Sequence, residues 1–418
     1  MTTTSTSEWV LDLDPADIDE QYARRGFADL SDEQCFDRAA RVIAIPKRDA
    51  ANSFILHAPL ELLARRALLP FVAPGRRAAV RRRMLWVAAT YERAAEPAPA
   101  APPESFTSPA DARRALVDGI GRRDLDRVDN AARALADHGS TEDVMACAAP
   151  TVDALAAAGH ASIYFFHLAH HAPSSRTALG LLRPLVRELA RAPQLRVEWV
   201  ARGVTAGGED PEQFTRALAL TPRLGLPGSD FIYPIVHQVD EDDRARPVIE
   251  PTLPRDASVA AIAVQRVAAW SMIRDDPASA PYGWSHCLTL PQAVLGLTPW
   301  LADPKVATAI AATYVVGFRA AQGNGDLDLD AAPARVSVPL PDALAADPAT
   351  AAGAAFHASD AVLDAIVPEL AARAGAHEDA HLAKYTLACF DAAARDPEQR
   401  NLYFAAAAYL HAWWAGIA

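Results

Sequence analysis

The chain has 418 residues, a formal net charge of −12, 51% hydrophobic residues and only 7% aromatic residues. A chain of this length can bury a large core, and its abundance of alanine favours helix nearly throughout. An acidic protein lacks the basic surface that nucleic acid requires, so we expect no nucleic-acid partner. We find no uncharged apolar stretch of about 18 residues, so no membrane span is expected.

The cysteines and the first residues indicate the compartment. Cys35, Cys147, Cys287 and Cys389 are far apart in the sequence and form no CxxC pair. The first residues, MTTTSTSEW, lack the apolar segment of a signal peptide. We therefore expect a reduced, cytoplasmic protein, in which each cysteine is a small buried apolar side chain. The sequence leaves the oligomeric state open.

The first half of the chain predicts a series of helices. Residues 1–10 are expected to be disordered, and Asp14 and Ser31 have the sequence context of helix N-caps. A proline- and alanine-rich linker over 96–104 cannot continue a helix and favours extended backbone. The predicted helices cover residues 51–69, 76–93, 109–138, 151–171 and 177–201.

The second half begins with the least regular part of the sequence. Residues 203–258 are rich in glycine, proline and charge, and a long excursion of this kind predicts an irregular cap over a functional site. A second loop is expected over 323–341. Helices are predicted over 257–273, 284–301, 304–321 and again within 342–418. Because candidate ligands lie on both sides of the 96–104 linker, we predict an all-α protein with one large bundle-like domain, 11–418, and long irregular loops.

Two groups of nitrogen-bearing side chains stand out on the predicted helices. His160 and His167 are seven residues apart, which on one helix places them on the same face two turns apart. His377, His381 and Lys384 have the i, i+4, i+7 spacing of one face of another helix. Helical bundles build metal centres from such inward-facing ligands.

Two further histidines lie in apolar segments. His57 has Glu61 one turn further along the same predicted helix, where a carboxylate can orient an imidazole as a partner behind a metal ligand. His286 lies near the start of the segment WSHCLTLPQAVL. A lone histidine on an apolar helix is usually a hydrogen-bonded core residue, but several such segments in one chain favour a metal centre.

The sequence leaves two other functions open. His377-Glu378-Asp379-Ala380-His381 satisfies HExxH, the pattern in which two histidines bind zinc and the glutamate is the general base of a hydrolase. However, Asp379 puts a charge where such helices carry uncharged residues, and no GxxH follows. Alternatively, the histidines belong to an ordinary core, and the chain is a non-catalytic helical binding protein.

In order and spacing, several segments resemble the questin oxidase-like family. GHASIYFFHLAHH, from Gly159, resembles its AHGLIRTAHAVR signature, and SHCLTLPQAV, from Ser285, resembles its H-x-x-T-x-x-x-A segment. HLAKYTLAC, from His381, resembles H-x-x-K-x-x-x-A-C. The stretch around His57 resembles the family's early histidine before a leucine-rich helix. The resemblance extends over most of the chain.

This resemblance implies a metal-dependent oxygenase of aromatic polyketide natural products. The family's members hold a mononuclear non-haem iron, Fe(II), with four histidines and a lysine that is carboxylated in at least some of them. Carried over, the partners are a small aromatic or polycyclic substrate and O2, and the reaction is ring oxidation or C–C bond cleavage. Tyr164, which replaces an arginine of the signature, and Lys384 are the candidate catalytic residues. The implied metal ligands are His57, His160 or His167, His286, His381 and Lys384.

Overall fold

The computed structural model describes residues 13–152, 155, 159–171, 176–191, 196–223 and 232–416. Within these ranges the chain forms helices joined by turns, and its isolated β-bridges are Lys47 with Pro97 and Gly208 with Pro254. The prediction of an all-α protein is confirmed. The expected disorder of residues 1–10 falls outside the described residues.

The chain divides into two compact units, where the sequence predicts one large domain. Unit 1 comprises residues 1–195 and 375–383, and unit 2 comprises 196–374 and 384–418. The 96–104 segment is extended, as predicted, and lies inside unit 1 between two helices. The sequence gives no composition shift at 195 or at 375, because both units are built from alanine-rich helices of the same kind.

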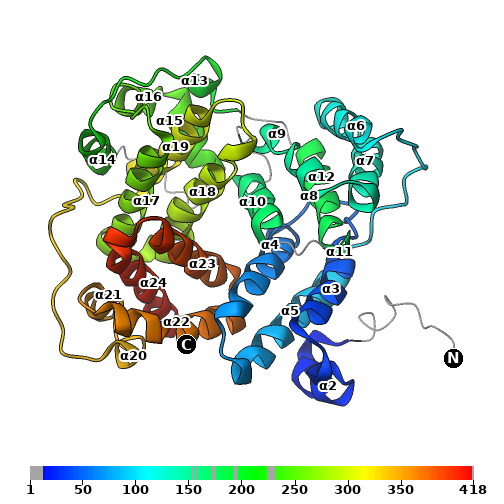
Figure 1. Cartoon of the computed structure of the whole chain (residues 1–418), viewed down its shortest axis with the longest axis horizontal. Helices are drawn as coiled ribbons and strands as arrows, with labels where there is room; N and C mark the ends of the chain where they lie inside the picture. The colour runs from blue at the N-terminus through cyan, green and yellow to red at the C-terminus, as the bar shows by residue number, and fades with distance from the viewer. Residues whose placement is uncertain are drawn as a thin grey trace. The chain divides into compact units, whose positions relative to one another are not determined.

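Unit 1 is a set of short and medium helices (Figure 1). α4 packs against α5 and α10, α3 packs against α5, and α7 packs against α6 and α12. The helices of unit 1 are α2 (Ile18–Arg24), α3 (Asp32–Ile43), α4 (Ser53–Leu68), α5 (Arg77–Ala94), α6 (Pro109–Arg122), α7 (Leu125–His138), α8 (Thr141–Met145), α9 (Ala149–Val152), α10 (Ala161–His171), α11 (Arg176–Leu179) and α12 (Leu182–Arg191).

Polar side chains set where these helices begin. Ser31 and Gln34 form a reciprocal capping box at the start of α3, and Asp14 accepts a hydrogen bond from the backbone of Ala16. Asn52 caps α4 by accepting from the Ile55 N–H at 2.9 Å. Each side chain satisfies a backbone donor that the helix itself cannot satisfy. The two N-caps expected from the sequence are confirmed.

Unit 2 has longer apolar helices at its centre. α17 packs against α14, α18, α19 and α24, and α21 packs against α24. A π-helical turn, η7 (Ala280–Trp284), runs directly into α18. The helices of unit 2 are α13 (Glu198–Ala201), α14 (Pro211–Ala219), α15 (Ile232–Glu241), α16 (Arg246–Ile249), α17 (Ala257–Arg274), α18 (Ser285–Gly296), α19 (Pro304–Gln322), α20 (Leu340–Ala343), α21 (Pro348–Phe356) and α24 (Arg400–Ala415).

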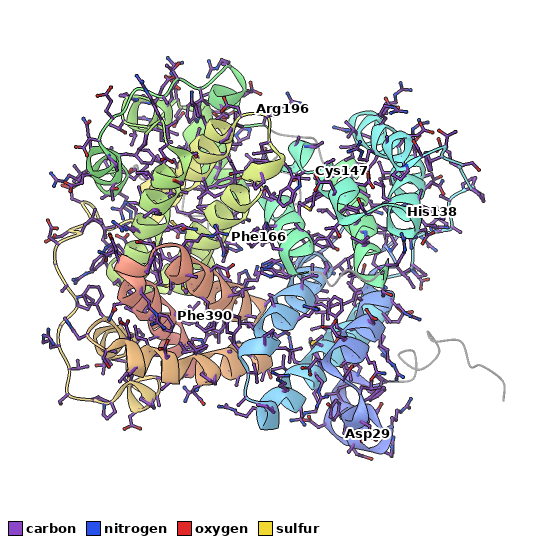
Figure 2. All side chains as sticks on the ribbon, viewed as in Figure 1. Asp29, His138, Cys147, Phe166, Arg196 and Phe390 are labelled. Atoms are coloured by element: carbon purple, nitrogen blue, oxygen red, sulfur yellow. The ribbon has the colours of Figure 1, made fainter. Side chains whose placement is uncertain are left out.

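Two helices, α22 (Asp360–Ala376) and α23 (Ala380–Arg395), contain the points at which the chain passes between the units. Phe390 on α23 belongs to unit 2, and Phe166 on α10 belongs to unit 1. Both residues are labelled in Figure 2. Both aromatic side chains are buried. The segment from Gly375 to Ala383 therefore joins the end of α22 to the start of α23 within unit 1.

Three of the predicted helices are interrupted. Residues 109–138 form α6 and α7, because Arg123 adopts a left-handed conformation with φ 59° and Asp124 caps a new helix. In 151–171, α9 ends at Val152 and α10 starts only after Gly159, which has φ 83°. The 177–201 stretch is likewise divided among α11, α12 and α13.

The prediction of an irregular cap over 203–258 is wrong in part. The described residues of this region include the helices α14, α15 and α16. α14 and α16 have a proline in the first turn, and α15 begins with an apolar residue. A continuous apolar period does not mark the starts of these helices in the sequence. Glycine and proline act here as helix boundaries, which a composition-based assignment of loop overlooks. The loop before α20 agrees with the prediction for 323–341.

The cysteines follow the prediction. All four are unpaired by disulfides and buried, and burial raises the pKa of the Cys35 and Cys147 thiols to about 12. A thiol with so high a pKa is not a nucleophile at neutral pH. In the described part of the chain, no helix has the length and apolarity to cross a membrane.

Candidate metal centre

Three histidines of unit 1 come together from distant parts of the sequence. Their candidate ligand nitrogens, on His57, His160 and His381, all lie within 4.8 Å of one another. The His57 ring centroid is 4.6 Å from that of His160 and 4.9 Å from that of His381. We call these residues the three-histidine cluster. The convergence that the sequence could only suggest is therefore present for these three predicted ligands.

His57 lies in the second turn of α4. Its Nδ1 is 2.7 Å from the carbonyl oxygen of Ser53, four residues earlier on the same helix. Because a carbonyl can only accept, Nδ1 carries the proton and Nε2 carries the lone pair. The predicted support of His57 by Glu61 is wrong, since the backbone of α4 provides this hydrogen bond.

His160 precedes α10 rather than lying within it. Its carbonyl oxygen accepts the hydrogen bond from Tyr164 N–H at 2.9 Å that starts the helix. The left-handed turn at Gly159 places His160 at this entry, and its side chain is buried. The expected stacking of His160 over His167 on one helix is therefore wrong, because a glycine with positive φ is a position where helices begin and end.

His381 lies in the first turn of α23, two residues after Asp379. A single carboxylate oxygen, Asp379 Oδ1, is 2.8 Å from His381 Nδ1 and accepts a hydrogen bond from the His381 backbone N–H at 2.7 Å. The carboxylate assigns the proton to Nδ1, so Nε2 of His381 also carries the lone pair. The side chain of Asp379 is 21% exposed and that of His381 is 10% exposed.

A buried charge cluster holds the segment that leads into α23. Glu61 accepts hydrogen bonds from Arg65 Nε at 2.9 Å and from Arg83 Nε at 2.9 Å. Arg65 also donates to the carbonyls of Gly375 and His377, the latter at 2.6 Å, and Arg83 donates to the carbonyl of Glu378. Arginine side chains of α4 and α5 therefore hold the backbone of the loop before His381 by hydrogen bonds. Buried charges are tolerated here because each is paired and hydrogen-bonded.

The donor set of the three-histidine cluster fits a transition-metal ion. Imidazole nitrogen binds zinc, copper, iron and nickel, and a typical metal–nitrogen distance is about 2.1 Å. Two nitrogens bound to one ion thus lie at most about 4.2 Å apart, so a 4.8 Å limit needs only a small closure of the rings. Nδ1 hydrogen bonds such as those of His57 and His381 are typical of metal-ligating histidines.

Two predicted or candidate histidines lie elsewhere in unit 1. His167, buried on α10, contacts Phe166 and His171, with ring centroids at 5.5 and 5.3 Å. Of the two alternatives at this signature, the cluster therefore includes His160. His377 lies in the turn between α22 and α23, and its Nδ1 accepts a hydrogen bond from Asp379 N–H at 3.0 Å. Burial lowers the pKa of His377.

The placement of His377 bears on the HExxH motif. α22 ends at Ala376 and α23 starts at Ala380, so His377 and His381 share no helix. The expected i, i+4, i+7 row of His377, His381 and Lys384 is wrong for its first member. Because a zinc peptidase needs both motif histidines on one face of one helix, the motif lacks the geometry of that class. Asp379, a helix cap, is what interrupts it.

His286 belongs to unit 2 and follows the π-helical turn η7. Its Nδ1 contacts the carbonyl oxygen of Tyr282, four residues earlier, which leaves the lone pair on Nε2. Single π-helical turns are frequent at functional sites. A backbone carbonyl therefore fixes the tautomer of His286, as it does for His57. Its assignment as a metal ligand stays a prediction from the sequence.

Lys384 follows His381 by three residues on α23, a spacing that puts both on one face of the helix. Its side chain is only 1% exposed, so it does not extend into solvent at the helix surface. Long cationic side chains are rarely buried to this extent. Whether Lys384 binds a metal or is carboxylated stays a prediction.

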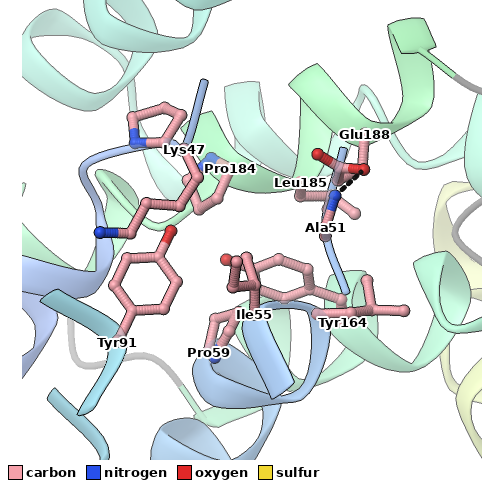
Figure 3. Close-up of a pocket in the computed structure, with 11 residues that line it drawn as sticks. Lys47, Ala51, Ile55, Pro59, Tyr91, Tyr164, Pro184, Leu185 and Glu188 are labelled. Carbon is pink, nitrogen blue, oxygen red and sulfur yellow. Dashed lines mark hydrogen bonds between the residues drawn. The ribbon is translucent and has the colours of Figure 1, made fainter. Parts of the chain in front are cut away.

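Tyr164 borders a small cavity of unit 1 (Figure 3). Its hydroxyl donates to the carbonyl of Leu181 at 2.6 Å, and burial raises its pKa well above 10. In the same cavity Lys47 lies over the Tyr91 ring, and Glu188 accepts a hydrogen bond from Ala51 N–H at 3.1 Å. The cavity volume is about 20 Å³, which is room for about one water molecule. Tyr164 thus has a structural role here, and its catalytic assignment is not supported by this geometry.

Trp199 and Trp284 are core residues of unit 2. Trp199 donates from Nε1 to the Thr313 hydroxyl at 3.1 Å, and Trp284 donates to the Asp276 carbonyl at 2.9 Å. Both rings are fully buried. A buried tryptophan normally finds such a partner, so their presence in the sequence does not identify a substrate pocket.

Sequence reasoning missed the role of Asp379 and of the Glu61–Arg65–Arg83 cluster at this centre. The role of Asp379 could have been inferred from the sequence, because its carboxylate directly precedes the helix that contains the candidate ligand His381. Comparison with known proteins finds no matching family model, no matching curated protein and no matching solved structure. The resemblance to the questin oxidase-like family therefore stays a prediction.

Proposed function

We propose that this protein is a metal-dependent oxygenase that uses a mononuclear non-haem iron and O2 to oxidise an aromatic or polycyclic natural product. The observation that supports the proposal most is the three-histidine cluster, in which His57, His160 and His381 converge from three separate segments. The class of reaction and of substrate comes from the sequence resemblance. A core histidine needs no such convergence, so the cluster favours metal binding over a scaffold role.

The chain's own residues would hold the ion through neutral imidazoles. His57 and His381 present Nε2, because their Nδ1 atoms are bonded to the Ser53 carbonyl and the Asp379 carboxylate. Bound iron(II) would supply a place where O2 can bind and be activated. His286 and Lys384 complete the ligand set that the resemblance implies. A carboxylated Lys384 would add a hard oxygen ligand and offset part of the metal charge.

The test is oxygen uptake by protein reconstituted anaerobically with ferrous iron and assayed with a panel of hydroxylated polycyclic aromatics. We expect uptake that depends on both iron and substrate, and that His57→Ala abolishes. His167→Ala is the matched control, because it removes a buried histidine of the same unit outside the three-histidine cluster. Products made under ¹⁸O2 would show by mass how many oxygen atoms enter the substrate.

Two results would contradict the proposal. One is iron-independent uptake, or uptake that His57→Ala leaves unchanged. The other is hydrolysis of a peptide by zinc-loaded protein that Glu378→Gln abolishes, since Glu378 has no role in the proposed oxygenase. The second result would restore the HExxH hydrolase despite the separation of its histidines by the turn between α22 and α23.

A further inference from the structure

The Asp379 carboxylate differs from the other groups that support the histidines. The Nδ1 atoms of His57 and His286 contact backbone carbonyls, which belong to their own helical turns. His381 Nδ1 instead contacts a side chain, Asp379 Oδ1, at 2.8 Å. A side-chain carboxylate is negatively charged and can be removed by substitution, whereas a backbone carbonyl is uncharged and cannot be removed in this way.

The same oxygen also caps the start of α23. Asp379 Oδ1 accepts the backbone N–H of His381 at 2.7 Å, and Asp379 immediately precedes α23. One atom therefore fixes both the helix start and the orientation of the imidazole that extends from that start. The N-terminal end of a helix carries partial positive charge and disfavours a nearby cation. A carboxylate at this position offsets that effect.

The backbone of the turn is held in place from the other side. Arg65 donates to the carbonyl of His377, and Arg83 donates to the carbonyl of Glu378, the residue before Asp379. Asp379 N–H donates to His377 Nδ1 at 3.0 Å. These contacts hold the backbone beside Asp379, and the Asp379 carboxylate contacts His381 through both hydrogen bonds.

We infer that Asp379 is a positioning residue of the metal centre, which orients His381 and increases the metal affinity of its Nε2 through a charged hydrogen bond. This inference rests on the proposed function. Partners of this kind change metal affinity by about 10- to 100-fold when they are removed from other metal sites. Asp379 itself contributes no ligand atom to the centre.

The experiment is a titration of metal-free protein with Co(II), followed by the visible absorption of the bound ion, for wild type, Asp379→Ala and Asp379→Asn. We expect Asp379→Ala to weaken binding by about 10- to 100-fold. Asp379→Asn keeps an oxygen that can accept a hydrogen bond and loses the charge, so its affinity should lie between the other two. The Co(II) spectrum of Asp379→Ala should also shift, because the ring of His381 is no longer held.

Asp124→Ala is the matched control for helix capping. Asp124 Oδ1 accepts the Arg127 N–H at 3.0 Å at the start of α7, also in unit 1. We expect both alanine variants to lower the melting temperature of the metal-free protein, and only Asp379→Ala to weaken Co(II) binding. If Asp379→Ala does not fold, Asp379→Asn carries the comparison.

The outcomes separate the two proposals. Co(II) binding within twofold of wild type in both Asp379 variants would overturn this inference and leave the proposed function standing. A wild-type protein that binds no Co(II), Zn(II) or Fe(II) would overturn the proposed function and this inference with it.

Discussion

At the scale of single residues, Asp391 is a partly buried acid whose ionisation opposes folding. Burial raises its pKa to about 6, although Gln292 Nε2 donates to its carboxylate at 2.8 Å. A raised carboxyl pKa means that the folded state prefers the protonated form. The corresponding stability is present at low pH, below the pKa of the unfolded chain, and is lost as the pH rises through about 6.

We therefore expect Asp391→Asn to stabilise the protein at pH 7.5 by up to about 3 kcal/mol, since each pKa unit corresponds to about 1.4 kcal/mol. The gain should disappear near pH 4, where the wild-type carboxyl is protonated. Urea unfolding at several pH values measures it, with the exposed Asp326→Asn as the control. A stability difference between Asp391→Asn and wild type that does not change with pH would contradict the assignment.

Several residue roles could be predicted from sequence, and others could not. The sequence marks His57 and His160 as candidates because they lie in apolar segments, and His381 because of its spacing from His377 and Lys384. The same reasoning paired Glu61 with His57, since i, i+4 neighbours share a helix face. In the structure Glu61 pairs with Arg65 and Arg83 instead. Arg83 belongs to another helix, and sequence spacing carries no information on such long-range partners.

At the scale of the elements, two glycines inside helices should respond oppositely to the same substitution. A Cβ at Gly121 of α6 would meet nothing within 4 Å, whereas a Cβ at Gly353 of α21 would lie 2.3 Å from the Ala334 carbonyl oxygen. The loop before α20 passes close to α21 at Gly353, and only a residue without a side chain allows that approach.

We expect Gly121→Ala to stabilise the protein by about 0.5–1 kcal/mol, through the helix propensity of alanine. Gly353→Ala should destabilise it by about 1–2 kcal/mol, because the backbone displacement outweighs the same propensity gain. Thermal unfolding of the two variants beside wild type measures both shifts. Equal stabilisation by both would show that the loop does not contact α21 in solution.

The helices whose bounds were predicted well are those with a long apolar period and clear ends, such as α4, α5, α17 and α19. The errors fall at positions where the backbone changes direction without proline or an obvious cap. Arg123 is such a position, because an arginine at positive φ has no sequence signature. Gly159, with φ 83°, is another, because it lies in an apolar run for which the sequence predicts continuous helix.

At the scale of the whole molecule, the chain forms two units, and unit 1 is built from two separate stretches. Residues 375–383 return to unit 1 after the chain has formed most of unit 2. His381 thus reaches His57 and His160 only through this return. Alanine-rich helices of similar composition on both sides hide such a boundary, so the division had to come from the structure.

The metal content of untagged protein, purified without added metal and analysed by elemental mass spectrometry, shows directly whether the three-histidine cluster holds an ion. We expect about one iron per chain in wild type and in His167→Ala, and loss of that iron in His57→Ala, His160→Ala and His381→Ala with helicity retained. Full metal content in the three cluster variants would contradict it. So would a metal-free wild type that takes up no ion after anaerobic reconstitution with ferrous iron.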